Sequence, residues 1–105
     1  MALIDEVRFS LRITDSSNEE LNTELQGYID EAITDLTETT DIKPFTADTS
    51  DALLRGAIIA YAHYKFEVDV NRRKNYKEAY DDMKTKILMS SKYSTLGGDP
   101  DDSHT

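Results

Sequence analysis

Apolar residues recur at helical spacing along most of this chain, and the clearest run extends from Ser17 to Glu38. Its apolar positions repeat at intervals of three and four residues, which is typical of one buried stripe on a long amphipathic helix. They are Leu21, Leu25, Tyr28, Ile29, Ala32, Ile33 and Leu36. Ser17, followed three residues later by Glu20, predicts a capping box at the start of this helix.

Two segments flank this helix in the predicted fold. Residues 3–13 place Leu3, Val7 and Leu11 on one face and predict a short helix packed against the long one. After a loop broken by Pro44, residues 52–66 are apolar nearly all round, which predicts the central and most buried helix. Asp48, Ser50 and Asp51 are candidates for its N-cap.

The central helix contains Gly56, which costs roughly 1 kcal/mol relative to alanine in a helix interior. That cost is tolerable if Gly56 marks a close approach of two helices. A last helix is expected from about Arg72 to Ser91, capped by Asp69 or Asn71. The predicted class is therefore all-α, a small bundle of one short and three longer helices.

The chain ends in a segment of different composition. Residues 92–105 contain Gly97, Gly98 and Pro100, and Leu96 is the single aliphatic side chain among them. Such a segment buries too little to order itself, so we expect a helical domain over residues 1–91 and a flexible tail over residues 92–105.

Composition narrows the class of protein. The 105 residues contain no cysteine, and 12 Lys and Arg oppose 21 Asp and Glu, giving a net charge of −9. This balance argues against a protein that grips nucleic-acid phosphates. The start lacks a signal peptide, and the longest apolar run, residues 56–62, is too short to span a bilayer, so a soluble protein assembled in the cytoplasm is expected.

The charges are divided between helices. From Asp15 to Ile42 there are nine acidic residues and no Lys or Arg, whereas from Lys65 to Lys92 eight basic residues oppose five acidic ones. Five carboxylates lie along one side of the first long helix: Glu20, Glu24, Glu31, Asp35 and Glu38. Four basic residues open the last helix: Arg72, Arg73, Lys74 and Lys77. We expect these two faces to pair, within the fold or between neighbouring copies, and a head-to-tail contact repeated by rotation closes a ring.

No arrangement typical of catalysis is present in the sequence. Motifs for metalloproteases, serine hydrolases and phosphate loops are missing, and the two histidines, His63 and His104, lie far apart in the chain. His63 on a mostly buried helix is better interpreted as a hydrogen-bonded histidine at the margin of the core. We therefore expect no catalytic residue, no metal site and no cofactor.

Two stretches carry a family resemblance. Residues 3–13 (LIDEVRFSLRI) with the helix that contains YIDEAI at 28–33, and LLRGAIIAYAHY at 53–64, are together similar to head–tail connector proteins of tailed double-stranded DNA bacteriophages. The order and spacing of the segments, over roughly residues 2–90, carry the resemblance. The element after the central helix, EVDVNR at 67–72, departs from the family's pattern.

The resemblance implies a non-enzymatic structural protein of the virion, located at the head–tail junction. It implies a ring of about a dozen copies, monomeric when free, that joins the portal protein, extends the DNA channel and supports the next neck, stopper or tail-completion protein. Passing DNA would meet an acidic wall without specific binding. The family's C-terminal segment commonly docks on the portal, which makes Lys92, Tyr93 and Leu96 the corresponding candidates here.

A second hypothesis remains open from the same residues. The nine-carboxylate stretch also suits an acidic helical binding module, or a DNA-mimicking regulator that covers a basic partner surface.

Overall fold

The computed structural model describes residues 2–40, 42–90 and 92–93. Four helices follow one another: α1 (Leu3–Ser10), α2 (Glu19–Thr39), α3 (Ala52–Phe66) and α4 (Val70–Leu88). The described residues form no β-sheet, which confirms the predicted all-α class and the pattern of one short and three longer helices. The predicted flexible tail lies, from residue 94 onward, outside the described residues.

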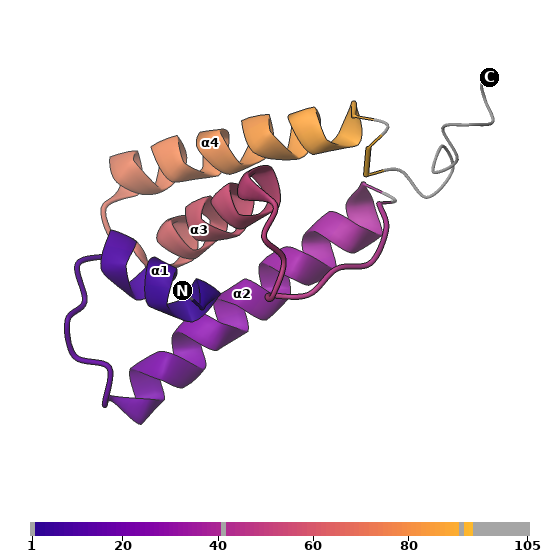
Figure 1. The fold of residues 1–105 in the computed structure, drawn as a ribbon. Helices are drawn as coiled ribbons and strands as arrows, with labels where there is room; N and C mark the ends of the chain where they lie inside the picture. The colour runs from indigo at the N-terminus through magenta and orange to yellow at the C-terminus, as the bar shows by residue number, and fades with distance from the viewer. Residues whose placement is uncertain (1, 41, 91, 94–105) are drawn as a thin grey trace, which may run out of the picture.

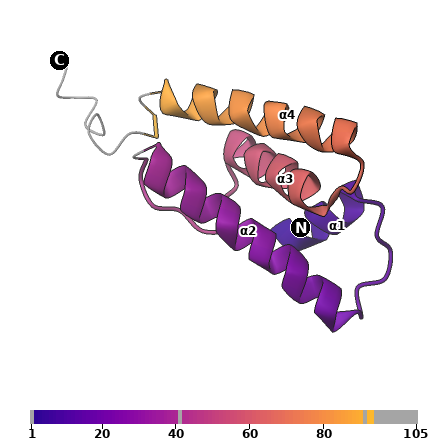
Figure 2. The ribbon, with the colours of Figure 1, turned by 180° about the vertical axis from the view of Figure 1, so that it is seen from behind.

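Helix α3 is the central element, as its apolar circumference predicted. It lies between α2 and α4 in both views of the ribbon, and it also contacts α1 (Figures 1 and 2). Its inward side chains, among them Ile58 and Ala62, are fully buried. The α2 stripe packs against it through Leu25, Ile29 and Leu36, all with no exposed surface.

Side-chain caps fix three of the helix starts. Asp51 Oδ1 accepts a hydrogen bond from the Leu54 backbone N–H, and Asp69 Oδ1 accepts one from Arg72, so two of the predicted caps are confirmed. The prediction of a capping box at Ser17 is wrong. The Ser17 N–H and hydroxyl both donate to Asp15 Oδ1, and Asn18 instead caps α2 by accepting from Leu21.

The last helix also differs from its predicted bounds. It begins at Val70, two residues before Arg72, because the cap is Asp69 and not Asn71. It ends at Leu88 and not at Ser91. Just after its end, the Ser90 N–H donates a hydrogen bond to the Ile87 carbonyl oxygen at 3.2 Å. Met89 follows with 80% of its surface exposed, so no apolar contact extends the helix further.

Gly56 faces α4, but the structure does not require a glycine at this position. A Cβ atom at this position would lie 3.5 Å from Met83 Sδ, an ordinary van der Waals distance, so the packing of α3 on α4 leaves room for a methyl group here. We predict that Gly56→Ala stabilises the fold by up to about 1 kcal/mol through helix propensity. Urea unfolding checks this, with Gly27→Ala as the matched control, because a Cβ at Gly27 meets nothing within 4 Å. A loss of stability for Gly56→Ala alone would show that Met83 cannot accommodate the methyl group.

Candidate assembly surfaces

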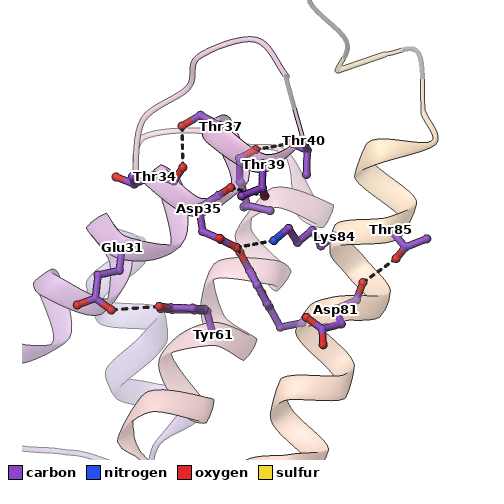
Figure 3. A network of polar contacts seen from close by, with 12 residues as sticks. Glu31, Thr34, Asp35, Thr37, Thr39, Thr40, Tyr61, Asp81, Lys84 and Thr85 are labelled. Atoms are coloured by element: carbon purple, nitrogen blue, oxygen red, sulfur yellow. Dashed lines mark hydrogen bonds and ion pairs between the residues drawn. The ribbon is translucent and has the colours of Figure 1, made fainter.

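The predicted acidic face of α2 divides into residues paired within the fold and residues left exposed. Glu31 accepts a hydrogen bond from the Tyr61 hydroxyl at 3.1 Å (Figure 3). It also lies 3.7 Å from Lys65 Nζ, and Tyr61 and Lys65 both belong to α3. The pKa of Tyr61 is raised to about 12, first by burial and then by this contact with Glu31. Lys65 of α3 therefore balances part of the negative charge of α2.

Asp35 joins α2 to α4. Its Oδ2 atom accepts hydrogen bonds from the Tyr80 hydroxyl at 2.5 Å and from Lys84 Nζ at 2.8 Å (Figure 3). Tyr80 is only 1% exposed, and burial followed by the bond to Asp35 raises its pKa. Burial pushes the pKa of Asp35 upward, but the Lys84 and Tyr80 bonds outweigh it and leave that pKa below its ordinary value. Asp35 thus serves the fold itself.

The other three acidic candidates have no cation beside them among the described residues. Glu24 Oε2 accepts a hydrogen bond from the Tyr28 hydroxyl of the same helix at 2.5 Å. Glu20 and Glu38 are exposed and form no ion pair within the part of the chain that the structure describes. The acidic surface available to a partner is thus carried by Glu20, Glu24 and Glu38.

The paired residues Glu31 and Asp35 form part of the lining of an acidic hollow, which the sequence pattern alone did not indicate. Its volume is about 440 Å³, and its lining is Asp30, Glu31, Thr34, Asp35, Glu38 and Tyr61. Tyr61 belongs to α3, so only the packing of α3 on α2 brings it to these carboxylates. A hollow of this charge suits a cationic side chain.

The four basic candidates of α4 divide in the same way. Arg73 Nε donates to the Tyr64 carbonyl oxygen at 3.1 Å, and its guanidinium lies 5.3 Å from the Tyr64 ring centroid. Lys77 Nζ donates to both carboxylate oxygens of Asp81, which raises the pKa of Lys77. Arg72 and Lys74 are exposed, and their side chains have no partner among the described residues.

The unpaired charges lie on different sides of the molecule. Helices α2 and α4 approach each other toward their C-terminal ends, where Lys84 reaches Asp35. They diverge toward their N-terminal ends, with α3 between them (Figures 1 and 2). Glu20 is in the first turn of α2, and Arg72 and Lys74 are near the start of α4. A single copy therefore leaves these groups apart.

Two of the three candidate docking residues after α4 contact the fold. The Tyr93 hydroxyl and Lys92 Nζ both donate to the Asp51 carboxylate at 2.9 Å, and the Lys43 N–H donates to the Tyr93 carbonyl oxygen at 2.8 Å. A docking role for Lys92 and Tyr93 would therefore compete with Asp51. Leu96 lies outside the described residues.

Asp51 accordingly caps α3 and holds the residues after α4. Although burial alone would raise it, the pKa of Asp51 falls to about 2 through the Leu54 N–H, Lys92 and Tyr93. Because this folded-state pKa is below the ordinary 3.8, the ionised form stabilises the fold above about pH 4, and the contribution is lost as the pH falls toward 2.

We predict that Asp51→Asn, which keeps an N-cap acceptor, loses stability at pH 7 and about half as much at pH 3 relative to the parent. Asp51→Ala also loses the cap and should cost about 1 kcal/mol more at either pH. Urea unfolding at the two pH values measures both differences. An equal deficit of Asp51→Asn at pH 7 and pH 3 would contradict the ionic part of the argument.

His63 ties three helices together at the opposite end of α3. Its Nε2 lies 2.8 Å from Ser10 Oγ of α1, and its ring centroid is 4.6 Å from that of Tyr76 of α4. Burial lowers the pKa of His63. The described residues contain no group of three or more metal-ligating side chains of the His, Cys, Asp or Glu type. Within the same residues, no helix combines the length and apolarity needed to cross a membrane.

Comparison with family models, curated proteins and solved structures gives no match for this chain.

Proposed function

We propose that this chain is a structural subunit of a phage head–tail connector, which assembles into a ring at the portal vertex. The observation that carries the proposal is the separation of charges that have no ion-pair partner among the described residues: Glu20 and Glu24 lie near the start of α2, and Arg72 and Lys74 lie near the start of α4, where the two helices diverge (Figures 1 and 2). Two different surfaces that complement each other form a head-to-tail contact, and such contacts close into rings when the rotation permits. The resemblance over residues 2–90 supports the same role.

In this role, the subunit performs no chemistry. Its partners are the portal protein on one side and a neck, stopper or tail-completion protein on the other, and its location is the head–tail junction of the virion. Carboxylates that no neighbour pairs, on a chain with a net charge of −9, would line the channel and repel the phosphates of passing DNA.

Mass measurement of the purified chain mixed with its portal protein tests the proposal. We expect a discrete complex in which about a dozen copies join one portal assembly, and we expect the protein at the neck of mature particles. A monomer in solution is compatible with the proposal, because the portal can template the ring. Failure to join the portal, together with absence from particles, would overturn it.

The acidic hollow of about 440 Å³ favours one alternative, a module that binds a basic partner as a DNA mimic. Its lining includes four carboxylates, of which Asp30 and Glu38 have no lysine or arginine paired with them among the described residues. Affinity capture from an infected lysate separates the two functions. Recovery of portal and neck proteins supports the connector, whereas recovery of a nucleic-acid-binding protein, displaced by added DNA, supports the mimic.

A further inference from the structure

The C-terminal end of α1 forms a second hollow, which the connector contact described above does not use. It is lined by Phe9, Ser10, Arg12, Ile13 and Thr14, and its volume is about 430 Å³. We call these five residues the Phe9 hollow. Phe9 is 79% exposed although it belongs to a helix whose other face is buried in the core. A large aromatic side chain left in water at the edge of a hollow is typical of a surface that a partner covers.

Arg12 adds strain at the same place. Its φ angle of 62° lies in the left-handed region, where the chain turns after α1 and the Ile13 N–H bonds back to the Arg8 carbonyl oxygen at 2.9 Å. Glycine usually occupies this position at a helix end, because a Cβ atom is unfavourable there. An arginine at this position has a strained backbone conformation. Its guanidinium forms no ion pair or hydrogen bond to the described residues.

The lining of the hollow carries one charged side chain, Arg12, beside the apolar Phe9 and Ile13. The Ser10–His63 contact places the end of α1 beside the end of α3, where the chain passes into α4 (Figure 1). That connection exposes Val68 and Val70 by 89% and 79%, and it also contains Glu67 and Asp69. An occupant of complementary chemistry would carry carboxylates and an aliphatic side chain together.

The chain itself contains such a segment. Residues 94–105 include Leu96, Asp99, Asp101 and Asp102, and they contain no Lys or Arg. The segment leaves the fold after Tyr93, which is held at Asp51 near the start of α3, the end remote from His63. Twelve extended residues reach about 40 Å, which is enough to extend beyond the subunit to a neighbour.

We propose that residues 94–105 of one copy bind the Phe9 hollow of an adjacent copy, with Leu96 on Phe9 and the aspartates facing Arg12. This inference rests on the proposed ring, because it assumes neighbouring copies in head-to-tail order. Each subunit then holds the next through a tether in addition to the α2–α4 charges. Once either contact forms, it raises the effective concentration for the other.

Photo-cross-linking of the full chain tests this contact. Leu96 is replaced by p-benzoylphenylalanine in isotopically heavy copies, which are mixed with light copies and irradiated with and without portal protein. We expect cross-linked peptides that join heavy position 96 to light residues 9–14. Cross-links confined to one copy, to another surface of the neighbour or to the portal alone would overturn the proposal, as would the absence of any cross-link under both conditions.

Substitutions in the light copy show whether the hollow itself binds. Arg12→Gly relieves the positive φ, and Phe9→Ser alters a side chain already in water, so both variants keep the fold. Each should reduce the heavy-to-light yield at least tenfold, whereas Lys86→Ala, which removes an exposed α4 cation elsewhere, should leave it unchanged. Equal yields from all three variants would contradict the proposal. Cross-links between copies without portal joining would support this contact and count against the connector function.

Discussion

Reversal of Arg72 and Lys74 to glutamate is expected to abolish ring formation on the portal and to leave the fold intact. Both side chains are exposed and unpaired within the described part of a single copy, so the change should shift the stability of the monomer by less than about 0.5 kcal/mol. The two reversals change the local charge by four units, so attraction to Glu20 and Glu24 of a neighbour becomes repulsion. Native mass spectrometry with portal protein and thermal unfolding of the free chain measure the two effects.

The matched control is a double variant with the same change in net charge elsewhere, Lys43→Glu with Lys86→Glu, whose side chains are also exposed. It should assemble almost normally, because charges more than about 8 Å from the contact are screened at physiological salt. Reversing Glu20 and Glu24 to lysine in the variant that carries the reversed Arg72 and Lys74 should restore assembly. Normal assembly of the first double variant at moderate salt would remove the α2–α4 pairing as the ring contact.

Arg73 is unsuitable for this experiment, although sequence alone placed it in the same basic face. Its guanidinium bonds the Tyr64 carbonyl oxygen and covers the Tyr64 ring, so a substitution there would disturb the α3–α4 junction and the surface together.

Asp35→Ala should give the largest loss of stability among the substitutions considered, about 2–3 kcal/mol. The change leaves the Tyr80 hydroxyl, which is almost fully buried, and the Lys84 ammonium without their acceptor. Tyr80→Phe, which removes only the hydroxyl, should cost about 1 kcal/mol, and Asp35→Asn should fall between the two. In thermal unfolding, each kcal/mol corresponds to a shift of about 4–8 °C for a domain of this size.

A double-mutant cycle with Asp35→Ala and Tyr80→Phe isolates the bond between them. We expect the two losses to be clearly non-additive, because the second substitution removes a partner that is already missing. Additive losses would show that the 2.5 Å contact contributes nothing beyond the packing of the Tyr80 ring.

The sequence predicted the helices well because their apolar stripes repeat locally. It also included Asp51 and Asp69 among the candidate caps, and the structure selects these two from the alternatives Asp48, Ser50 and Asn71. It misplaced the start of α2, because Asp15, Ser17 and Asn18 offer competing local hydrogen bonds and spacing alone does not choose among them.

The candidate surfaces were harder to predict, because pairing joins residues distant in the chain. Asp35 finds Lys84 49 residues later, and Glu31 finds Tyr61 30 residues later. The sequence pattern of α2 does not distinguish these two carboxylates, which are paired within the fold, from Glu38, which has no ion pair among the described residues. The exposure of Phe9 was not predicted either, although the sequence places Phe9 off the helix face that Leu3 and Val7 share.

The central position of α3 has a consequence for how the chain opens. Because α3 touches all three other helices, its amides can exchange with solvent only when several contacts break together. Helix α1 is eight residues long and can detach while the α3–α4 pair stays closed. Native-state hydrogen exchange should therefore show slow amides around Ile58 and Ala62 and fast amides in α1, so that the Phe9 hollow belongs to the part of the molecule that opens first.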